Sequence, residues 1–336
     1  MIISRTPFRI SFIGGGSDLP AFFTRSKGAV LSTAINKYMY ISVHPYFNRR
    51  QFQIKYSKTE LCDSVEEINH PIVRETLKYL NVDGGLEIIS MADVPAGTGL
   101  GSSSAFTVGL LHSIYSCLGK FVSKDRLASE ASMMEIERVG EPIGKQDQYA
   151  AAYGGLNVIT FNVDGSVEVE PLNLNAETSR KLDNNLLMFY TKLNRKANSI
   201  LEEQSREILQ EEKFGTQKKM VELVYSAVEA LYADDLEGFA DILHQNWLLK
   251  KSLLGKISNS QINKYYERAL EYGAIGGKLL GAGGGGFLLF YCPEQNQERL
   301  RKALFDLYEL KFSFDQQGSK IIYVGEKDWE EYGFFE

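Results

Sequence analysis

The sequence predicts an α+β protein with two domains, and three observations support this fold class. Segments with the composition and alternating pattern of strands are mixed with helical segments in the first half. Amphipathic helical segments dominate the second half. Between them, residues 173–183 are polar and have no hydrophobic period, which is typical of a domain boundary. We therefore expect an N-terminal domain over residues 1–172 and a C-terminal domain over residues 173–336.

The first half is expected to form a mixed sheet backed by helices. Residues 8–13 alternate with the period of a strand, and β-branched and aromatic runs predict more strands. These further strands cover residues 30–42, 51–56, 86–91, 156–161 and 167–169. Helices are expected at residues 71–80, 105–118 and 123–138. Pro71 suits the first turn of its helix, and Ser123 suits an N-cap.

The second half is expected to combine many helices with an antiparallel sheet. Its helices should cover residues 197–209, 214–232, 236–250, 260–272 and 295–307. Its strands should cover residues 186–190, 287–291 and 320–324. Ligand sites often form between domains, so we expect the active site there.

Composition limits the class of protein. Hydrophobic residues make up 44% and charged residues 24% of the 336 residues, as in globular proteins. The net charge of −6 argues against nucleic acid as the main partner, and no apolar run reaches membrane-spanning length. The N-terminus has a strand pattern, not the pattern of a signal peptide. Three widely spaced cysteines fit a reducing cytoplasm.

The most informative segment lies between the strand 86–91 and the helix that follows it. Three glycines there allow sharp turns and close approach of backbone N–H groups to a ligand. Three serines follow at the helix start, where free N–H groups and the helix dipole favour an anion. This predicts a phosphate-binding loop, although an ordinary N-capped helix has the same residues. The residues concerned are Pro95, Gly97, Thr98, Gly99, Leu100, Gly101, Ser102, Ser103 and Ser104.

Two common phosphate-binding motifs are excluded. A P-loop ends in Gly-Lys-Ser/Thr, and no Gly-Lys pair in the chain is followed by Ser or Thr. The dinucleotide fingerprint requires a third glycine five positions after the first. Counted from Gly97, that position is Ser102.

Three other segments are candidates for the same site. The first strand leads through three glycines to Ser17 and Asp18, so Arg9 and Asp18 either face an open site or form an ordinary turn. Carboxylates gather between Glu135 and Asp147, although such clusters are often solvated surface charges. A late glycine-rich segment, residues 276–286, leads into the strand 287–291.

Together these segments resemble the GHMP kinases, the family named for galactokinase, homoserine kinase, mevalonate kinase and phosphomevalonate kinase. The resemblance spans residues 5–289, and Pro95-x3-Gly99-Leu100-Gly101-Ser102-Ser103 is highly specific to that family. It implies the two-domain GHMP kinase-like fold. Residues 14–20, 99–105 and 140–148 look most like the heptose kinase branch. That likeness implies transfer of the ATP γ-phosphoryl group to the C1 hydroxyl of D-glycero-D-manno-heptose 7-phosphate.

The resemblance also implies roles for residues. The glycine loop would bind the phosphates of ATP, and Mg²⁺ would bind Ser103 and Glu135. Glu135 stands five positions before Gly140, as in the family, whereas Glu137 is the alternative ligand. Asp147 would be the catalytic base that accepts the proton of the attacking hydroxyl. Arg9 would be the second catalytic residue, a cation that holds Asp147 ionised and stabilises the phosphoryl group.

The acceptor sugar would bind between the first-strand loop, the carboxylate cluster and the late glycine loop. The expected contacts are Gly15, Gly16, Ser17, Asp18, Lys145, Asp147, Arg195, Gly283 and Gly284. Lys145 and Arg195 are included because a second phosphate requires cations or backbone N–H groups. The chain has Gly15-Gly16 where galactokinase has a Glu-His pair, so sugar contacts in that loop cannot be transferred.

The implied partners are therefore a small-molecule sugar phosphate and ATP, with neither nucleic acid nor a membrane. The sequence does not indicate the oligomeric state. Two alternatives remain open, a GHMP kinase for another sugar such as fucose or galactose, and a non-catalytic sensor of sugar and ATP. A sensor needs no base, so the presence of Arg9, Ser103, Glu135 and Asp147 together disfavours it.

Overall fold

The structure, a computed structural model, describes residues 1–193 and 197–325 and contains two sheets. In the first sheet the strands follow the order β12-β1-β2-β5-β3-β4. Their bounds are β1 (Ile2–Ile13), β2 (Gly28–Pro45), β3 (Phe52–Lys55), β4 (Thr59–Cys62), β5 (Leu86–Ala92) and β12 (Lys320–Val324). β6 (Leu156–Phe161) pairs with β2, and β7 (Val167–Pro171) pairs with β6.

The long strand β2 organises this sheet. Its first part, Gly28 to Thr33, pairs with β6, and its last part, Met39 to Pro45, pairs with β5. β1 runs antiparallel beside both parts, and β3 is parallel to β5. The sheet is therefore mixed, as the sequence predicts.

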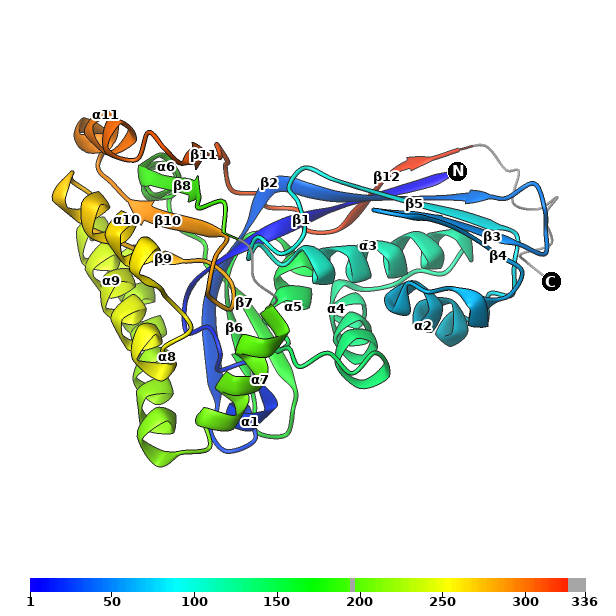
Figure 1. The fold of residues 1–336 in the computed structure, drawn as a ribbon, viewed down its shortest axis with the longest axis horizontal. Coiled ribbons are helices and arrows are strands. Elements are labelled where there is room, and N and C mark those ends of the chain that lie inside the picture. Colours follow the sequence, from blue (N-terminus) through cyan, green and yellow to red (C-terminus); the bar gives the residue numbers. More distant parts are fainter. Residues whose placement is uncertain (194–196, 326–336) are drawn as a thin grey trace.

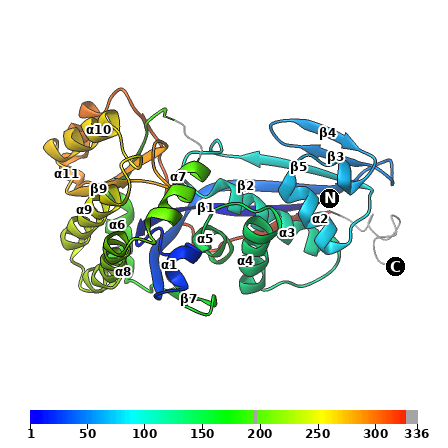
Figure 2. The ribbon, with the colours of Figure 1, turned by 60° about the horizontal axis from the view of Figure 1, so that its bottom comes forward.

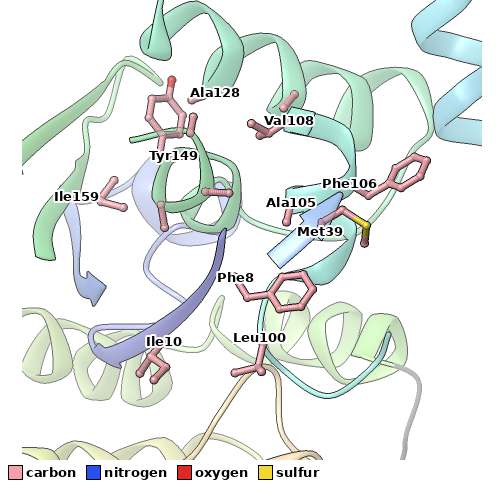
Figure 3. Close-up of a cluster of buried hydrophobic side chains, with 14 of the residues drawn as sticks. Phe8, Ile10, Met39, Leu100, Ala105, Phe106, Val108, Ala128, Tyr149 and Ile159 are labelled. Atoms are coloured by element: carbon pink, nitrogen blue, oxygen red, sulfur yellow. The ribbon is translucent and has the colours of Figure 1, made fainter. Parts of the chain in front are cut away.

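Helices cover one face of the first sheet (Figure 1). They are α2 (Pro71–Leu80), α3 (Ser102–Cys117), α4 (Lys124–Met133) and α5 (Gln146–Tyr153). Most residues of α3 are buried, because this helix lies between the sheet and its neighbouring helices. Figure 3 shows side chains of this core, with Phe8 and Ile10 from β1, Leu100 from the glycine loop, Ala105 from α3 and Tyr149 from α5.

The second sheet is antiparallel and has the order β11-β8-β10-β9. Its strands are β8 (Leu186–Tyr190), β9 (Gly276–Leu279), β10 (Phe287–Tyr291) and β11 (Tyr308–Glu309). Helices around it are α6 (Ala176–Asn185), α8 (Glu211–Tyr232), α9 (Leu236–Leu253), α10 (Ser260–Glu271) and α11 (Glu294–Ala303). The short helix α1 (Pro20–Phe23) lies close to α7 (Ala197–Glu207) (Figure 2).

Several elements differ from the sequence prediction for physical reasons. Helix α6 occupies the segment expected to be an irregular boundary, and it buries only Thr178 and Leu182, too few residues for a visible period. β9 begins with Gly276 and Gly277, which weaken a strand signal. A Cβ at Gly277 would lie 2.4 Å from the Leu289 carbonyl oxygen, so β10 requires a glycine there.

The predicted helix 123–138 is divided into two parts. α4 ends at Met133, and a five-residue π-helical turn, Met134–Arg138, follows it. Such turns are rare and are often found at functional sites. This one carries Glu135, which is completely buried.

The predicted division at residue 172 does not separate the two sheets. β12, which belongs to the predicted C-terminal segment, pairs antiparallel with β1 in the first sheet. A helix-rich second part with an antiparallel sheet is present, but the chain returns from it to the first part. The boundary at residue 172 itself stays a prediction.

Phe12 packs where the two parts of the structure meet, so its substitution tests how they are held together. Its buried ring contacts Phe239 of α9 edge to face, at 5.6 Å between centroids, and Phe314 at 6.4 Å. Phe12→Ala should lower the free energy of unfolding by about 3–5 kcal/mol, measured by urea denaturation. Phe47→Ala is the control, because Phe47 is 95% exposed, and it should change this free energy by no more than about 0.5 kcal/mol. Equal effects of the two substitutions would contradict this packing.

Candidate active site

A cavity of about 300 Å³ lies between the two parts of the structure. Its walls come from β1 and the loop after it, the glycine loop, the start of α3, the π-helical turn, α5, α7, α9 and the late glycine loop. This size is at the lower end of the range for small-molecule sites. The predicted location of the site, between the domains, agrees with this cavity.

Two glycine loops meet in the cavity wall with backbone against backbone. Gly99 has a φ of +87° and Gly281 a φ of +75°, a region that favours glycine. A Cβ at Gly99 would lie 2.6 Å from the Leu280 carbonyl oxygen, and a Cβ at Gly281 would lie 2.6 Å from the Gly99 Cα. Neither loop could hold this position with a side chain at these residues.

The start of α3 forms the anion-binding end of the cavity. Gly101 precedes the helix with a φ of +75°, and Ser102 is its first residue. The first N–H groups of a helix have no partner within it, and the helix dipole favours negative charge there. Of the predicted loop residues, Gly97, Gly99, Gly101, Ser102, Ser103 and Ser104 line the cavity.

Three predicted loop residues are not in the cavity wall. Pro95 accepts a hydrogen bond at its carbonyl from the Thr98 hydroxyl, at 3.0 Å, which shapes the loop. Leu100 is buried in the core, and its carbonyl accepts a hydrogen bond from the backbone N–H of Arg9 at 3.1 Å. Pro95, Thr98 and Leu100 therefore support the loop, and their predicted contact with the nucleotide stays a prediction.

Arg9 and Asp147 form a two-point ion pair. Arg9 Nε donates to Asp147 Oδ1 at 2.7 Å, and Arg9 Nη2 donates to Oδ2 at 2.7 Å. Arg9 Nη1 also donates to the Gly99 carbonyl at 2.6 Å. Both residues line the cavity, and the carboxylate is the more exposed member, since the side chain of Arg9 is 6% exposed and that of Asp147 is 24% exposed. The guanidinium fixes the orientation of that carboxylate.

Glu135 is held by two hydrogen bonds beside the glycine loop. Ser103 Oγ donates to Oε1 and Gln148 Nε2 donates to Oε2, each at 2.6 Å. Burial raises the pKa of Glu135 to about 7, although these hydrogen bonds lower it. Glu137 is exposed on the same turn and does not line the cavity. The geometry therefore favours Glu135 over Glu137 as a metal ligand.

The residues present fit Mg²⁺ bound together with phosphates. Glu135 is a buried carboxylate that forms no ion pair within residues 1–193 and 197–325, and a cation would compensate its charge. Mg²⁺ often takes only one or two protein carboxylates and completes its shell with water and substrate phosphate. Accordingly, no cluster of three or more His, Cys, Asp or Glu residues suited to a metal is found in the described chain.

Asp18 also lines the cavity. Its Oδ1 accepts hydrogen bonds from the Gly16 N–H and from Gln146 Nε2, both at 3.1 Å, and Oδ2 accepts one from the Gln146 N–H at 3.2 Å. Burial raises the pKa of Asp18, and the charge of Asp147 raises it further. Gly15, Gly16 and Gly283 line the same cavity, and their contact with the acceptor stays a prediction.

Other predicted acceptor contacts lie elsewhere. Ser17 is buried and bonds to the backbone of Ala29, while the Gly284 N–H donates to the Ile257 carbonyl. Lys145 turns away from the cavity, since Nζ donates to the Gly165 carbonyl at 2.8 Å and lies over the Phe23 ring. Ser17, Gly284 and Lys145 thus do not line the cavity, and their predicted contact with the acceptor stays a prediction. Arg195 lies outside the described residues.

Several cavity residues are not among the site residues predicted from the sequence. Lys278 and Lys250 are buried lysines, and Gln146 and Asn198 are amides. A lysine inside the apolar run before Leu279 was a visible signal for Lys278. Lys250 gave none, because Lys250 and Lys251 resemble ordinary charges in the last turn of a helix.

Comparison with known sequences decides the family. The profile described as GHMP kinases N terminal domain matches residues 54–155, and the one described as GHMP kinases C terminal matches residues 227–310. Together these segments cover more than half of the chain. The chain belongs to the GHMP kinases. The predicted family, its two-domain fold and its ATP-dependent kinase class are confirmed.

Relatives of this GHMP kinase include sugar kinases. The D-glycero-alpha-D-manno-heptose 7-phosphate kinase of Campylobacter jejuni is 28% identical over 95% of this chain and 98% of its own. A galactokinase of Pyrococcus furiosus is 25% identical over 93% of this chain and 95% of its own. The crystal structure of a D-glycero-D-manno-heptose 1-phosphate kinase from Bacteroides thetaiotaomicron has the same fold, with a TM-score of 0.79, 22% identity and coverage of 97% and 100%.

The magnesium site and the cytoplasmic location stay predictions. None of the helices in the described part of the GHMP kinase is long and apolar enough to cross a membrane. All three cysteines are buried and free.

The assignment of Glu135 can be tested against Glu137. Glu135→Gln should raise the Mg²⁺ concentration for half-maximal activity by about tenfold or more, because a ligand charge is lost. Glu137→Gln is the matched control, the same change on the same turn at an exposed position, and should leave the Mg²⁺ titration unchanged. A shift for Glu137→Gln with no shift for Glu135→Gln would move the role to Glu137.

Proposed function

We propose that this GHMP kinase transfers the γ-phosphoryl group of ATP to the C1 hydroxyl of D-glycero-D-manno-heptose 7-phosphate. The observation that carries the proposal is the placement of Asp147. Its carboxylate, oriented by Arg9, lies in the same cavity as the glycine loop and the start of α3. A base beside a phosphate-binding loop is the minimum that in-line phosphoryl transfer requires.

Each group then has a distinct part in the reaction. Asp147 accepts the proton of the acceptor hydroxyl, whose oxygen forms the new bond to the γ-phosphorus while the bond to the β–γ bridging oxygen breaks. Arg9 holds the carboxylate and places positive charge beside the reacting group. Ser103 and Glu135 would hold Mg²⁺, which would neutralise charge on the phosphates.

The polar part of the cavity wall fits a polyhydroxylated acceptor. Asp18, Gln146, Asn198 and Glu141 line it with carboxylate and amide groups, which donate to and accept from sugar hydroxyls. Gly15 leaves space beside them, because a Cβ there would have no atom nearer than Ser11 Oγ at 3.6 Å. A non-catalytic sensor would not need Asp147, Arg9 and Glu135 in one cavity, so the arrangement disfavours that alternative.

The heptose phosphate is supported by the Campylobacter jejuni relative, which matches over almost the full length of both chains. A galactose-like acceptor is the alternative, supported by the galactokinase relative. Because Lys145 faces away from the cavity, Arg195 stays the predicted contact for the 7-phosphate.

The catalytic base is tested by Asp147→Asn. This variant should bind ATP and keep its fold, but kcat should fall by about 10²–10⁴-fold because the proton acceptor is lost. Steady-state phosphoryl transfer and nucleotide binding are measured on the same protein. Asp164→Asn is the control, since Asp164 lies exposed in the β6–β7 turn. A variant Asp147→Asn with the unmutated kcat would show that Asp147 is not the base.

The acceptor is tested by comparing heptose 7-phosphate, free heptose and galactose with ATP. We expect kcat/KM for heptose 7-phosphate to exceed that for free heptose by about 100-fold, since charge-assisted hydrogen bonds contribute about 1.5–3 kcal/mol each. Equal values for the two heptoses would overturn the heptose phosphate proposal and leave the kinase assignment intact. A higher value for galactose would favour the alternative acceptor.

A further inference from the structure

Three cationic side chains from different elements converge on the cavity. Arg9 comes from β1, Lys250 from α9 and Lys278 from β9. All three are buried, with 5%, 5% and 1% of their surface exposed. The proposed reaction uses Arg9 alone, so the two lysines have no assigned part.

Lys250 reaches the point where the two glycine loops touch. Its Nζ donates to the Gly281 carbonyl at 2.7 Å, and Gly281 lies against Gly99. The Gly99 carbonyl in turn accepts the hydrogen bond from Arg9 Nη1. Lys250 and Arg9 therefore approach the same contact from the two parts of the structure.

Of the two lysines, Lys250 has more free hydrogen-bonding capacity. Arg9 is bound to Asp147 and to the Gly99 carbonyl, and Lys278 Nζ donates to the carbonyls of Ser11 at 2.6 Å and Phe12 at 2.9 Å. An ammonium group has three donors. Within the described residues the Gly281 carbonyl is the acceptor found for Lys250, and no carboxylate lies within ion-pair distance.

The electrostatic environment of Lys250 favours a bound anion. Burial, together with the charge of Arg9, lowers the pKa of Lys250 to about 8, although the charges of Asp18 and Asp147 act in the opposite direction. Lys278 has its pKa lowered by burial and by the charges of Lys250 and Arg9. Buried positive charges of this kind are unfavourable without a counter-charge, and the phosphates of a nucleotide would supply one.

We propose that Lys250 is a further catalytic residue, whose ammonium group binds the transferring phosphoryl group opposite Arg9. The inference rests on the proposed phosphoryl transfer but not on the identity of the sugar. Lys250 stabilises the negative charge on the phosphoryl oxygens from the side of α9, as Arg9 does from β1. Lys278, which donates to two carbonyls of β1, is a positioning residue that holds β9 against that strand.

An alternative assignment is that Lys250 binds the second phosphate of the acceptor. The location disfavours it, because Lys250 bonds to the loop that packs on Gly99 of the phosphate-binding loop. The two assignments differ in measurable ways. A contact with the transferring group acts on kcat for every acceptor, whereas a contact with the second phosphate acts on KM for phosphorylated acceptors.

The experiment compares Lys250→Met, Lys250→Arg and the control Lys251→Met with ATP and both forms of heptose. Lys251 is next in the chain but lies over the rings of Trp247 and Tyr266, outside the cavity. Lys250→Met should lower kcat by about 10²–10³-fold, the usual effect of losing one donor to a transition-state anion. The decrease in kcat should be the same for both acceptors, and Lys250→Arg should recover part of the lost activity.

Two results would overturn the proposal. A kcat for Lys250→Met within threefold of the unmutated protein would exclude the contact. A loss confined to KM of the phosphorylated acceptor would assign Lys250 to the second phosphate instead. Urea denaturation of each variant separates these results from a change in stability. The slow hydrolysis of ATP, which is phosphoryl transfer to water, should fall in Lys250→Met by the same factor as kcat for the sugar. If the unmutated protein phosphorylates no sugar, the proposed function fails, while hydrolysis still tests Lys250.

The pH profile gives a second measurement on the unmutated protein. The groups facing Lys250 are Arg9 of β1, Lys278 of β9, Asp147 of α5 and Asp18. Because the charged ammonium is the active form, kcat/KM for ATP, which reports groups of the free protein, should fall as pH rises through about 8. In Lys250→Arg the cation stays charged, so this fall should move to higher pH. An unchanged profile in Lys250→Arg would contradict the proposal.

Discussion

The ion pair of Arg9 with Asp147 is the interaction on which the arrangement of the cavity depends. The guanidinium of Arg9 donates to both carboxylate oxygens of Asp147 and to the Gly99 carbonyl, and the backbone N–H of Arg9 donates to the Leu100 carbonyl. One residue of β1 thereby positions the base on α5 and the glycine loop before α3. The carboxylate that faces the substrate is fixed by the same contacts that hold the loop, so the base and the phosphate-binding site keep a constant relation.

A second constraint joins the two parts of the chain. The backbones of Gly99 and Gly281 are in contact, Lys278 donates to two carbonyls of β1, and β12 returns to the first sheet. The cavity is therefore assembled from residues far apart in the sequence. Substitutions in the second part of the chain, such as those at Lys250, can therefore change the rate of a reaction whose base, Asp147, lies in the first part.

The sequence predicted the features that depend on local pattern. Most helices and strands followed from hydrophobic period, and the glycine loop, Arg9, Glu135 and Asp147 followed from motifs that the structure brings together. It failed where tertiary contacts decide. Whether Lys145 or Lys250 faces the cavity depends on the packing of α5 and α9, not on neighbouring residues. Ser17 looked like a ligand-binding serine, but its hydroxyl is used by the backbone of Ala29.

The most direct test is a crystal structure with a non-hydrolysable ATP analogue, Mg²⁺ and heptose 7-phosphate. The account predicts the phosphates at the start of α3 and the C1 hydroxyl oxygen within about 2.6–3.2 Å of an Asp147 carboxylate oxygen. It also predicts the terminal phosphate between Arg9 and Lys250. Phosphates bound away from residues 97–104, or a sugar with no hydroxyl near Asp147, would contradict it.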